Sequence, residues 1–132
     1  MDDKNRKNIL ILDPERDTAE LFSRALETHA QSCKCYWVQT PQEAGTLLSE
    51  IPFSFLLADF STLQQDHFLL LEAIRSMDCK TEVIVDAYLN QKDHVKKALE
   101  MGATGYFIKP IMVNSLRKLI DDFSRNSLPQ ES

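Results

Sequence analysis

Short apolar runs alternate along this chain with longer segments in which apolar residues recur every three or four positions. Short apolar runs are typical of buried strands, and the longer spacing is typical of amphipathic helices. The pattern predicts strands over residues 9–12, 35–39, 53–58, 82–86 and 105–109. It predicts helices over residues 17–29, 41–50, 68–77, 90–101 and 113–123. Strands and helices therefore alternate along the chain.

Two local signals define helix boundaries. The segment Thr40-Pro41-Gln42-Glu43 combines an N-cap residue, a proline suited to the first helical position and a glutamate placed to close a capping box. Gly102 predicts the end of the fourth helix, because glycine readily adopts the left-handed conformation that terminates helices. Residues 59–67 are predicted to form a loop.

The alternation of elements also predicts their arrangement. Strands joined through helices form parallel sheets with right-handed crossovers. The flavodoxin-like strand order 2-1-3-4-5 places the first and third strands side by side. The sequence therefore predicts an α/β fold, a doubly wound (βα)5 parallel sheet, over residues 8–124. Residues 1–7 are predicted to be a polar extension, and residues 125–132 a tail or the start of a linker.

Charged side chains stand at the ends of four predicted strands. Asp13, Asp59 and Asp86 end the first, third and fourth strands, and Lys109 ends the fifth. The carboxyl ends of parallel strands meet at one edge of a sheet, where ligands bind in open α/β folds. We therefore expect three carboxylates and one ammonium group to form a site. An aspartate in this position can alternatively serve as a helix or loop cap.

Composition narrows the function classes. With 132 residues, 43% hydrophobic and 27% charged, the chain suits one globular domain. The net charge of −5 argues against direct nucleic-acid binding, and no apolar stretch is long enough for export or a membrane span. A cytoplasmic protein is expected. Cys33, Cys35 and Cys79 are expected to be ordinary reduced thiols, with a metal or redox role as the alternative.

Four segments, taken in order, resemble the receiver domain of two-component response regulators. They are ILILD ending at Asp13, FLLAD ending at Asp59, VIVDA at residues 83–87 and GATGYFIKP at residues 102–110. The resemblance runs over about residues 8–123, and its last segment is the most specific. It implies a phosphorelay signalling domain rather than an enzyme, with a histidine kinase or phosphotransfer protein as partner.

The resemblance implies a role for each matching residue. Asp59 matches the phosphoacceptor, and Asp13 matches the first acidic residue of a pair that holds Mg²⁺ with it. Lys109 matches the lysine that pairs with the aspartate and then with its phosphoryl group. Tyr106 matches the switch aromatic, with plain core packing as the alternative. Pro110 matches a proline whose preceding peptide bond is usually cis.

The chain departs from the family pattern at the site itself. Pro14 stands where a second acidic metal ligand is usual. Asp86 stands where a Ser/Thr hydroxyl usually bonds a phosphoryl oxygen, and an ionised carboxylate cannot donate that bond. Leu63-Gln64 replaces a common Pro-Gly in the following loop, which is a milder change. We therefore expect phosphorylation to be weakened.

Two interpretations of the altered pocket remain open. In one, Asp86 pairs with Lys109, and the three aspartates titrate as a coupled cluster with at least one raised pKa. In the other, Asp86 compensates for Pro14, and the pocket still binds a divalent cation.

Three functions follow from these interpretations. The first is a phosphoacceptor domain with a weakened site. The second is a pseudo-receiver that dimerises or binds an output partner through the face from Asn90 to Phe123 without phosphorylation. The third and most remote is a small enzyme on a flavodoxin-like fold. Against an enzyme, the segment after the third strand lacks the Asp-x-Asp of aspartyl-phosphate hydrolases, and the first turn lacks the glycines of a dinucleotide site.

Overall fold

The computed structural model describes residues 7–29, 33–77 and 79–125. Within them, five parallel strands form one sheet in the order β2-β1-β3-β4-β5, as the sequence predicts. The order places β1 between β2 and β3, so the first and third strands are neighbours. The strands are β1 (Lys7–Leu12), β2 (Cys33–Val38), β3 (Phe55–Asp59), β4 (Glu82–Ala87) and β5 (Gly105–Ile108).

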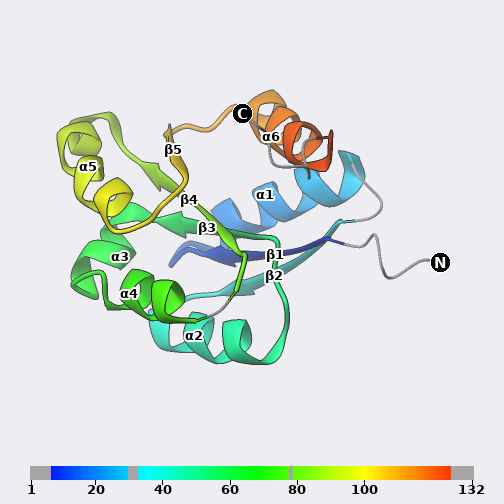
Figure 1. Ribbon diagram of the computed structural model, residues 1–132. Helices are drawn as coiled ribbons and strands as arrows, with labels where there is room; N and C mark the ends of the chain where they lie inside the picture. Colours follow the sequence, from blue (N-terminus) through cyan, green and yellow to red (C-terminus); the bar gives the residue numbers. More distant parts are fainter. Residues whose placement is uncertain (1–6, 30–32, 78, 126–132) are drawn as a thin grey trace.

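Helices cover both faces of the sheet (Figure 1). One face carries α1 (Arg16–His29) and α6 (Val113–Arg125). The other carries α2 (Pro41–Glu50), α3 (Phe60–Gln65), α4 (Leu69–Ser76) and α5 (Lys92–Glu100), with a 3-10 turn, η2 (Leu89–Gln91), before α5. Within the described ranges, no helix is both long and apolar enough to cross a membrane.

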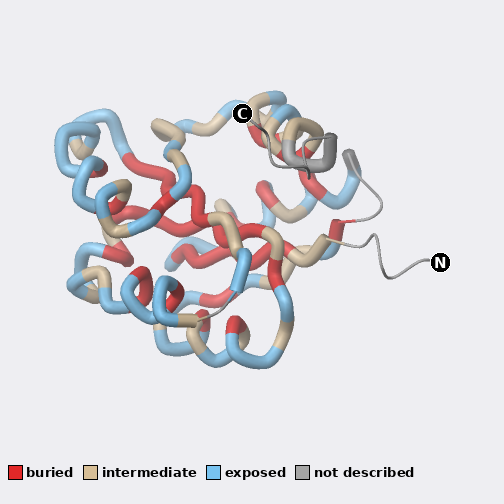
Figure 2. The backbone as a smooth tube through the Cα atoms, viewed as in Figure 1, coloured by how far each residue is buried: buried red, intermediate tan, exposed pale blue. Residues whose placement is uncertain are grey.

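Alternating side chains of the strands build two apolar cores. Ile9 and Ile11 of β1 point to the face of α1 and α6, whereas Leu10 and Leu12 point to the opposite face. Because both faces are covered, the central strands are apolar almost throughout, and Figure 2 shows them as the buried centre of the molecule. The central strands β1, β3 and β4 therefore present little more than their ends to solvent.

The N-terminal cap of α2 confirms the boundary predicted from sequence. The Thr40 hydroxyl accepts a hydrogen bond from the Glu43 N–H, and the Glu43 carboxylate accepts one from the Thr40 N–H. Pro41 opens the helix. Hydrogen bonds from the Gln39 and Thr40 N–H groups lower the pKa of the Glu43 carboxyl.

The loop predicted over residues 59–67 is wrong, because α3 occupies most of it. Asp59 is the N-cap of this helix, and its carboxylate accepts the Thr62 N–H. Phe60 and Leu63 are 1% and 0% exposed, so their burial against the core holds a helix too short to show a clear sequence period. Positive φ angles at His67 and Phe68, 55° and 59°, then separate α3 from α4.

Smaller differences concern the ends of elements. β2 begins at Cys33 rather than at residue 35, because it pairs with β1 along its whole length. β3 runs from Phe55 rather than from residue 53, and α5 ends at Glu100. Gly102 follows with a φ of 111°, the positive value expected of a terminating glycine.

The predicted extension and tail fall largely outside the described residues. Lys7, the last residue of the predicted extension 1–7, belongs to β1, and the remainder of that extension is not described. Arg125, the first residue of the predicted tail 125–132, is the last residue of α6, and the rest of the tail is likewise not described.

Candidate functional site

Three aspartates meet at the carboxyl edge of the sheet. Asp13 follows β1, and Asp59 and Asp86 are register partners on the neighbouring strands β3 and β4. They are 2%, 5% and 3% exposed, and one oxygen of each lies within 4.8 Å of the others. The sheet order brings these residues together from positions far apart in sequence, as the strand-end pattern predicts.

Asp59 has hydrogen-bond partners on both carboxylate oxygens. Lys109 Nζ lies 2.7 Å from Oδ1. The N–H and the hydroxyl of Thr62 donate to Oδ2 at 2.9 and 2.8 Å. Asp59 is thus both a member of the acidic cluster and the cap of α3, so the two interpretations of this residue hold together.

Asp86 is equally buried but has fewer partners. Its Oδ2 lies 3.6 Å from Lys109 Nζ, in ion-pair range, and has no hydrogen-bond donor. Burial raises the pKa of Asp86 to about 7, with Asp59 and Asp13 adding to the shift and Lys109 opposing it. The pairing of Asp86 with Lys109, which belongs to the first of the two interpretations of the pocket, is present in the structure.

The carboxylate of Asp13 is half satisfied. Its Oδ1 accepts the Glu15 N–H at 2.8 Å, while its buried Oδ2 has no hydrogen-bond donor. Burial raises the pKa of Asp13, and the negative charge of Asp59 adds to the shift, whereas the Glu15 N–H and Lys109 oppose it. Two residues of β2 hold the main chain of Asp13. The Asp13 N–H donates to the carbonyl oxygen of Val38 at 3.1 Å, and Trp37 Nε1 donates to the carbonyl oxygen of Asp13 at 2.8 Å.

Lys109 joins the cluster from the end of β5. Burial lowers its pKa, but the hydrogen bond to Asp59 and the charges of Asp86 and the other carboxylates outweigh burial, so the net shift raises the pKa. The ring of Tyr88 lies under the ammonium group, 4.6 Å from ring centroid to Nζ. The Lys109–Pro110 peptide bond is cis, as the resemblance leads one to expect.

Two other residues singled out in the sequence lie at the margin of the cluster. Pro14 is exposed beside Asp13 and offers no side-chain oxygen. Tyr106 on β5 is 39% exposed, so the alternative of plain core packing is wrong. Sequence reasoning missed the contacts that Thr62, Trp37 and Tyr88 make with the site from α3, β2 and the turn after β4. Their contacts follow from tertiary placement, and no sequence spacing indicates them.

The described cysteines form no disulfide: all three are free. Burial raises the pKa of Cys33, and burial with the nearby Glu27 carboxylate raises the pKa of Cys35 to about 12. Thiols with raised pKa values are poor nucleophiles and poor metal ligands at neutral pH. For Cys33 and Cys35, the raised pKa values favour ordinary thiols over a metal or redox role.

The carboxylate edge opens onto two cavities. One, of about 390 Å³, is lined by Pro14, Asp59, Ser61 and Thr62 together with the start of α2. The other, of about 280 Å³, is more apolar and includes Lys109 and Tyr88. Of the three aspartates, only Asp59 lines either of these cavities. A ligand that enters the first cavity therefore meets this carboxylate.

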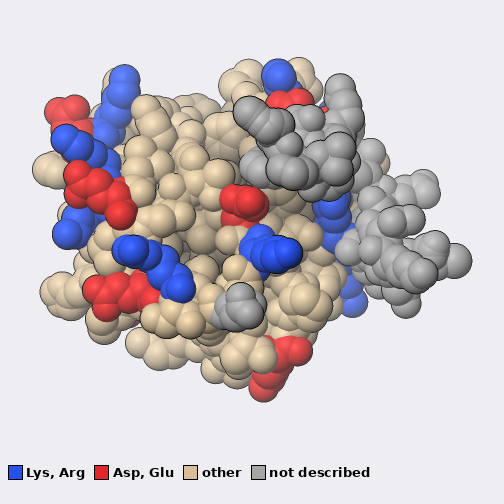
Figure 3. Space-filling model, in the orientation of Figure 1, with Lys and Arg blue, Asp and Glu red and all other residues tan. Residues whose placement is uncertain are grey.

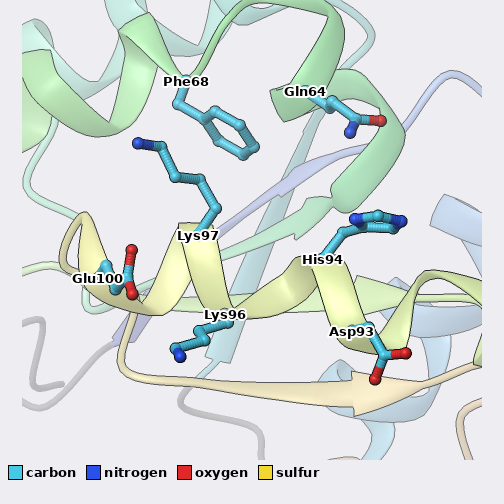
Figure 4. Close-up of a pocket in the computed structure, with 7 residues that line it drawn as sticks. All are labelled: Gln64, Phe68, Asp93, His94, Lys96, Lys97 and Glu100. Carbon is cyan, nitrogen blue, oxygen red and sulfur yellow. The ribbon is translucent and has the colours of Figure 1, made fainter.

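A separate cavity of about 330 Å³ lies between α5 and the segment around the end of α3 (Figure 4). In Figure 4, Lys97 extends towards Phe68 and His94 lies opposite Gln64. None of the three clustered aspartates lines this cavity, and its charged residues are of both signs. The same mixture is seen over the face shown in Figure 3, where basic and acidic side chains are interspersed. We therefore assign the candidate site to the carboxylate edge.

The donor set at this edge fits a hard divalent cation. Mg²⁺ takes oxygen ligands and is usually bound by one or two carboxylates and several waters. The buried Oδ2 atoms of Asp13 and Asp86 have no hydrogen-bond donors. With all groups ionised, three carboxylates and one ammonium carry a net charge of −2, which one divalent cation neutralises.

Comparisons with known proteins agree with this geometry. A family model described as "Response regulator receiver domain" matches residues 9–121. The transcriptional regulatory protein DcuR of Escherichia coli (strain K12) is 24% identical over 126 residues, which cover 94% of this chain and 53% of that protein. The two-component response regulator ARR10 of Arabidopsis thaliana is 28% identical over 116 residues, 84% of this chain and 21% of that protein. The chain thus spans about half or less of these curated relatives.

Solved structures show the same fold. A two-component response regulator from Clostridium difficile superposes with a TM-score of 0.81 at 20% identity, covering 94% of this chain and all of that one (100%). A response regulator from Thermotoga maritima gives a TM-score of 0.79 at 22% identity, covering 92% and 99% of the two chains. Together with the family match over most of its length, these findings show that the chain belongs to the response regulator receiver domains, the signalling domains of two-component systems.

Proposed function

We propose that Asp59 accepts a phosphoryl group, slowly, from a histidine kinase or phosphotransfer protein. One observation carries the proposal: Asp59 alone among the three aspartates has the Lys109 ammonium at hydrogen-bond distance, 2.7 Å, and lines an open cavity. Response regulators interact with such phosphodonors. The proposed folding unit is residues 8–124, and the proposed location is the cytoplasm, where these donors act.

The chemistry requires charge neutralisation more than covalent help. A carboxylate oxygen of Asp59 attacks phosphorus, the bond from phosphorus to the donor imidazole breaks, and the imidazole leaves with the electron pair and takes a proton from solvent. Lys109 neutralises charge on the carboxylate and then on the phosphoryl oxygens. Asp13 and Asp59 would hold Mg²⁺, which supplies further neutralisation of the phosphoryl group when bound.

Two features support a slow reaction. Pro14 removes one acidic ligand, and Asp86 returns a carboxylate at a different point of the pocket, so the net charge is kept while its distribution changes. Asp86 also shares Lys109 with Asp59 and, when ionised, repels an incoming phosphoryl group. Tyr106, exposed on β5, is the proposed switch side chain that responds to the modification.

A second candidate is a receiver that acts through protein contacts without phosphorylation. Both oxygens of Asp59 already have donors, and Tyr106 and Met112 expose 39% and 67% of their surface on the face from Asn90 to Phe123. A homodimer or an output partner would cover these apolar groups. Direct binding of nucleic acid is not proposed, because the chain carries a net charge of −5.

Intact-mass measurement distinguishes the two candidates. The protein is incubated with phosphoramidate and Mg²⁺, and the phosphoryl adduct is followed with time. A slowly forming adduct that is absent in Asp59→Ala is expected, with Asp93→Ala on the exposed face of α5 as the matched control. An unmodified wild-type protein after prolonged incubation would favour the phosphorylation-independent candidate.

A further inference from the structure

A hydroxyl group reaches Asp59 from an element that the family pattern does not use for this purpose. Position 86, where a hydroxyl is expected, holds a carboxylate. Thr62, on α3, places its hydroxyl 2.8 Å from Asp59 Oδ2, and the residue is 9% exposed. Its N–H donates to the same oxygen at 2.9 Å. The carboxylate thus has a hydroxyl donor on the side opposite Lys109.

The other hydroxyls that line the cavity beside Asp59 are engaged elsewhere. The Ser61 hydroxyl accepts a hydrogen bond from Gln91 Nε2 at 2.7 Å, so it is held towards the turn before α5. The Thr40 hydroxyl accepts the Glu43 N–H in the cap of α2. Among the hydroxyl groups lining this cavity, that of Thr62 is therefore the one that contacts the carboxylate.

The charge on each oxygen of Asp59 indicates where this donor acts. Oδ1 is paired with the ammonium of Lys109, whereas Oδ2 is bonded only by neutral donors. An oxygen with neutral partners keeps more of its negative charge for attack on phosphorus. A phosphoryl group on Oδ2 has its own oxygens close to the hydroxyl that contacted Oδ2 before the reaction.

We propose that the Thr62 hydroxyl orients Asp59 for phosphoryl transfer and then donates to a phosphoryl oxygen, in place of the hydroxyl that position 86 lacks. This inference rests on the proposed phosphorylation of Asp59. In the step, Oδ2 forms a bond to phosphorus while the bond to the donor nitrogen breaks, and the leaving group takes the electron pair and a proton from solvent. The hydroxyl keeps its proton and moves its hydrogen bond from the carboxylate to the phosphoryl group.

Two substitutions at the same position separate the hydroxyl from the methyl group of Thr62. Thr62→Val keeps the shape and the main-chain bond but loses the hydroxyl, whereas Thr62→Ser keeps the hydroxyl and loses the methyl group. With phosphoramidate and Mg²⁺, we expect Thr62→Val to form the adduct about tenfold more slowly, the cost of one hydrogen bond to a charged group. Thr62→Ser should stay within about twofold of the wild-type protein.

The opposite ranking would show a packing role: a normal rate in Thr62→Val with a slow Thr62→Ser overturns the inference. Equal rates in all three proteins overturn it as well and leave Asp59 phosphorylation standing. If the wild-type protein forms no adduct at all, the proposed function fails, and this inference fails with it. Far-ultraviolet circular dichroism of each variant, with its melting curve, checks that the fold is kept.

A hydroxyl introduced at position 86 tests directly whether Thr62 takes the role of the hydroxyl that this position lacks. In an Asp86→Thr background, position 86 can again donate to the phosphoryl group. We expect the slowing caused by Thr62→Val to shrink there from about tenfold to about threefold or less, because the two hydroxyls share one task. An unchanged tenfold effect in this background would show that Thr62 does not replace the hydroxyl of position 86.

Discussion

Asp59 and Asp86 occupy paired positions on adjacent strands, and yet their hydrogen-bond partners differ. Both are buried, at 5% and 3% exposure, and both lie near Lys109. Asp59 receives three hydrogen bonds, from Lys109 and from two donors of Thr62. Asp86 has an ion-pair contact at 3.6 Å and an oxygen without a donor.

The difference shows that donors rather than depth determine how costly a buried carboxylate is. Burial penalises the charged form of a carboxylate, and hydrogen bonds to the charged form offset that penalty. Asp86 lacks this compensation, and its pKa is raised to about 7. β3 therefore ends in a carboxylate with a donor on each oxygen, whereas β4 ends in a carboxylate with one buried oxygen that has no donor.

The largest effect is expected from removing the ammonium group of Lys109, which lies near both Asp59 and Asp86. Lys109→Met leaves both carboxylates without their positive partner, and breaking a buried pair on one side destabilises a protein by about 3 kcal/mol. Urea denaturation at pH 8 measures this loss of unfolding free energy. Lys97→Met, at an exposed position on α5, is the control and should change the value by less than about 0.5 kcal/mol. A loss under about 1 kcal/mol for Lys109→Met would show that the carboxylates do not depend on Lys109.

A pH-dependent effect of intermediate size is expected at Asp86. Its pKa is raised from 3.8 to about 7 in the folded protein, so between these values the folded form binds more protons than the unfolded form. The free energy of unfolding must then fall as the pH rises through this window. Asp86→Asn removes the effect and should be more stable than the wild-type protein by about 2 kcal/mol at pH 8, with no advantage at pH 4.

Urea denaturation of both proteins from pH 4 to pH 8 checks this prediction. The expected gain in unfolding free energy at pH 8 is smaller than the full linkage value, because asparagine also removes an anionic partner of Lys109. A stability difference that does not change with pH would contradict the raised pKa of Asp86. Asp59→Asn is the informative counterpart, because it removes a well-bonded anion and should destabilise the protein at pH 8.

The smallest effect concerns divalent cations. Trp37 is the only tryptophan, and its indole is bonded to the carbonyl oxygen of Asp13, so its fluorescence is placed to report cation binding at Asp13. We expect a saturable change in emission with Mg²⁺, and Asp13→Asn should weaken binding by about tenfold. Asp86→Asn removes one negative charge of the cluster and should weaken binding by about threefold. Equal dissociation constants for the wild-type protein and Asp86→Asn would show that this carboxylate does not act on the cation.

Sequence patterns predicted the strand order and the cluster because both depend on apolar runs that end in charged residues. Parallel strands leave one possible place for Asp13, Asp59 and Asp86, and Lys109 follows from the fifth strand by the same logic. The α2 cap was predicted for a similar reason, since its signal lies within four consecutive residues, Thr40 to Glu43.

The missed features depend on contacts that are not written in local spacing. α3 has six residues, too few to display a helical period, and the contact of Thr62 with Asp59 exists only because this helix forms. Trp37 reaches the main chain of Asp13 across 24 residues of sequence, and the ring of Tyr88 meets Lys109 through the placement of β4 beside β5. Such contacts follow from packing.

The position of Lys109 directly after the last strand has a consequence for how the acidic cluster gains its counter-charge. Asp13 follows β1, and Asp59 and Asp86 lie on β3 and β4, while their ammonium partner lies 50 residues beyond Asp59. Contacts between residues so distant in sequence form late, because a long loop must close first. All three aspartates therefore precede their counter-charge in the sequence, and the pairing of β5 with β4 brings the ammonium group to them. Docking of β5 therefore draws on the electrostatic attraction of Lys109 to Asp59 and Asp86 as well as on apolar burial.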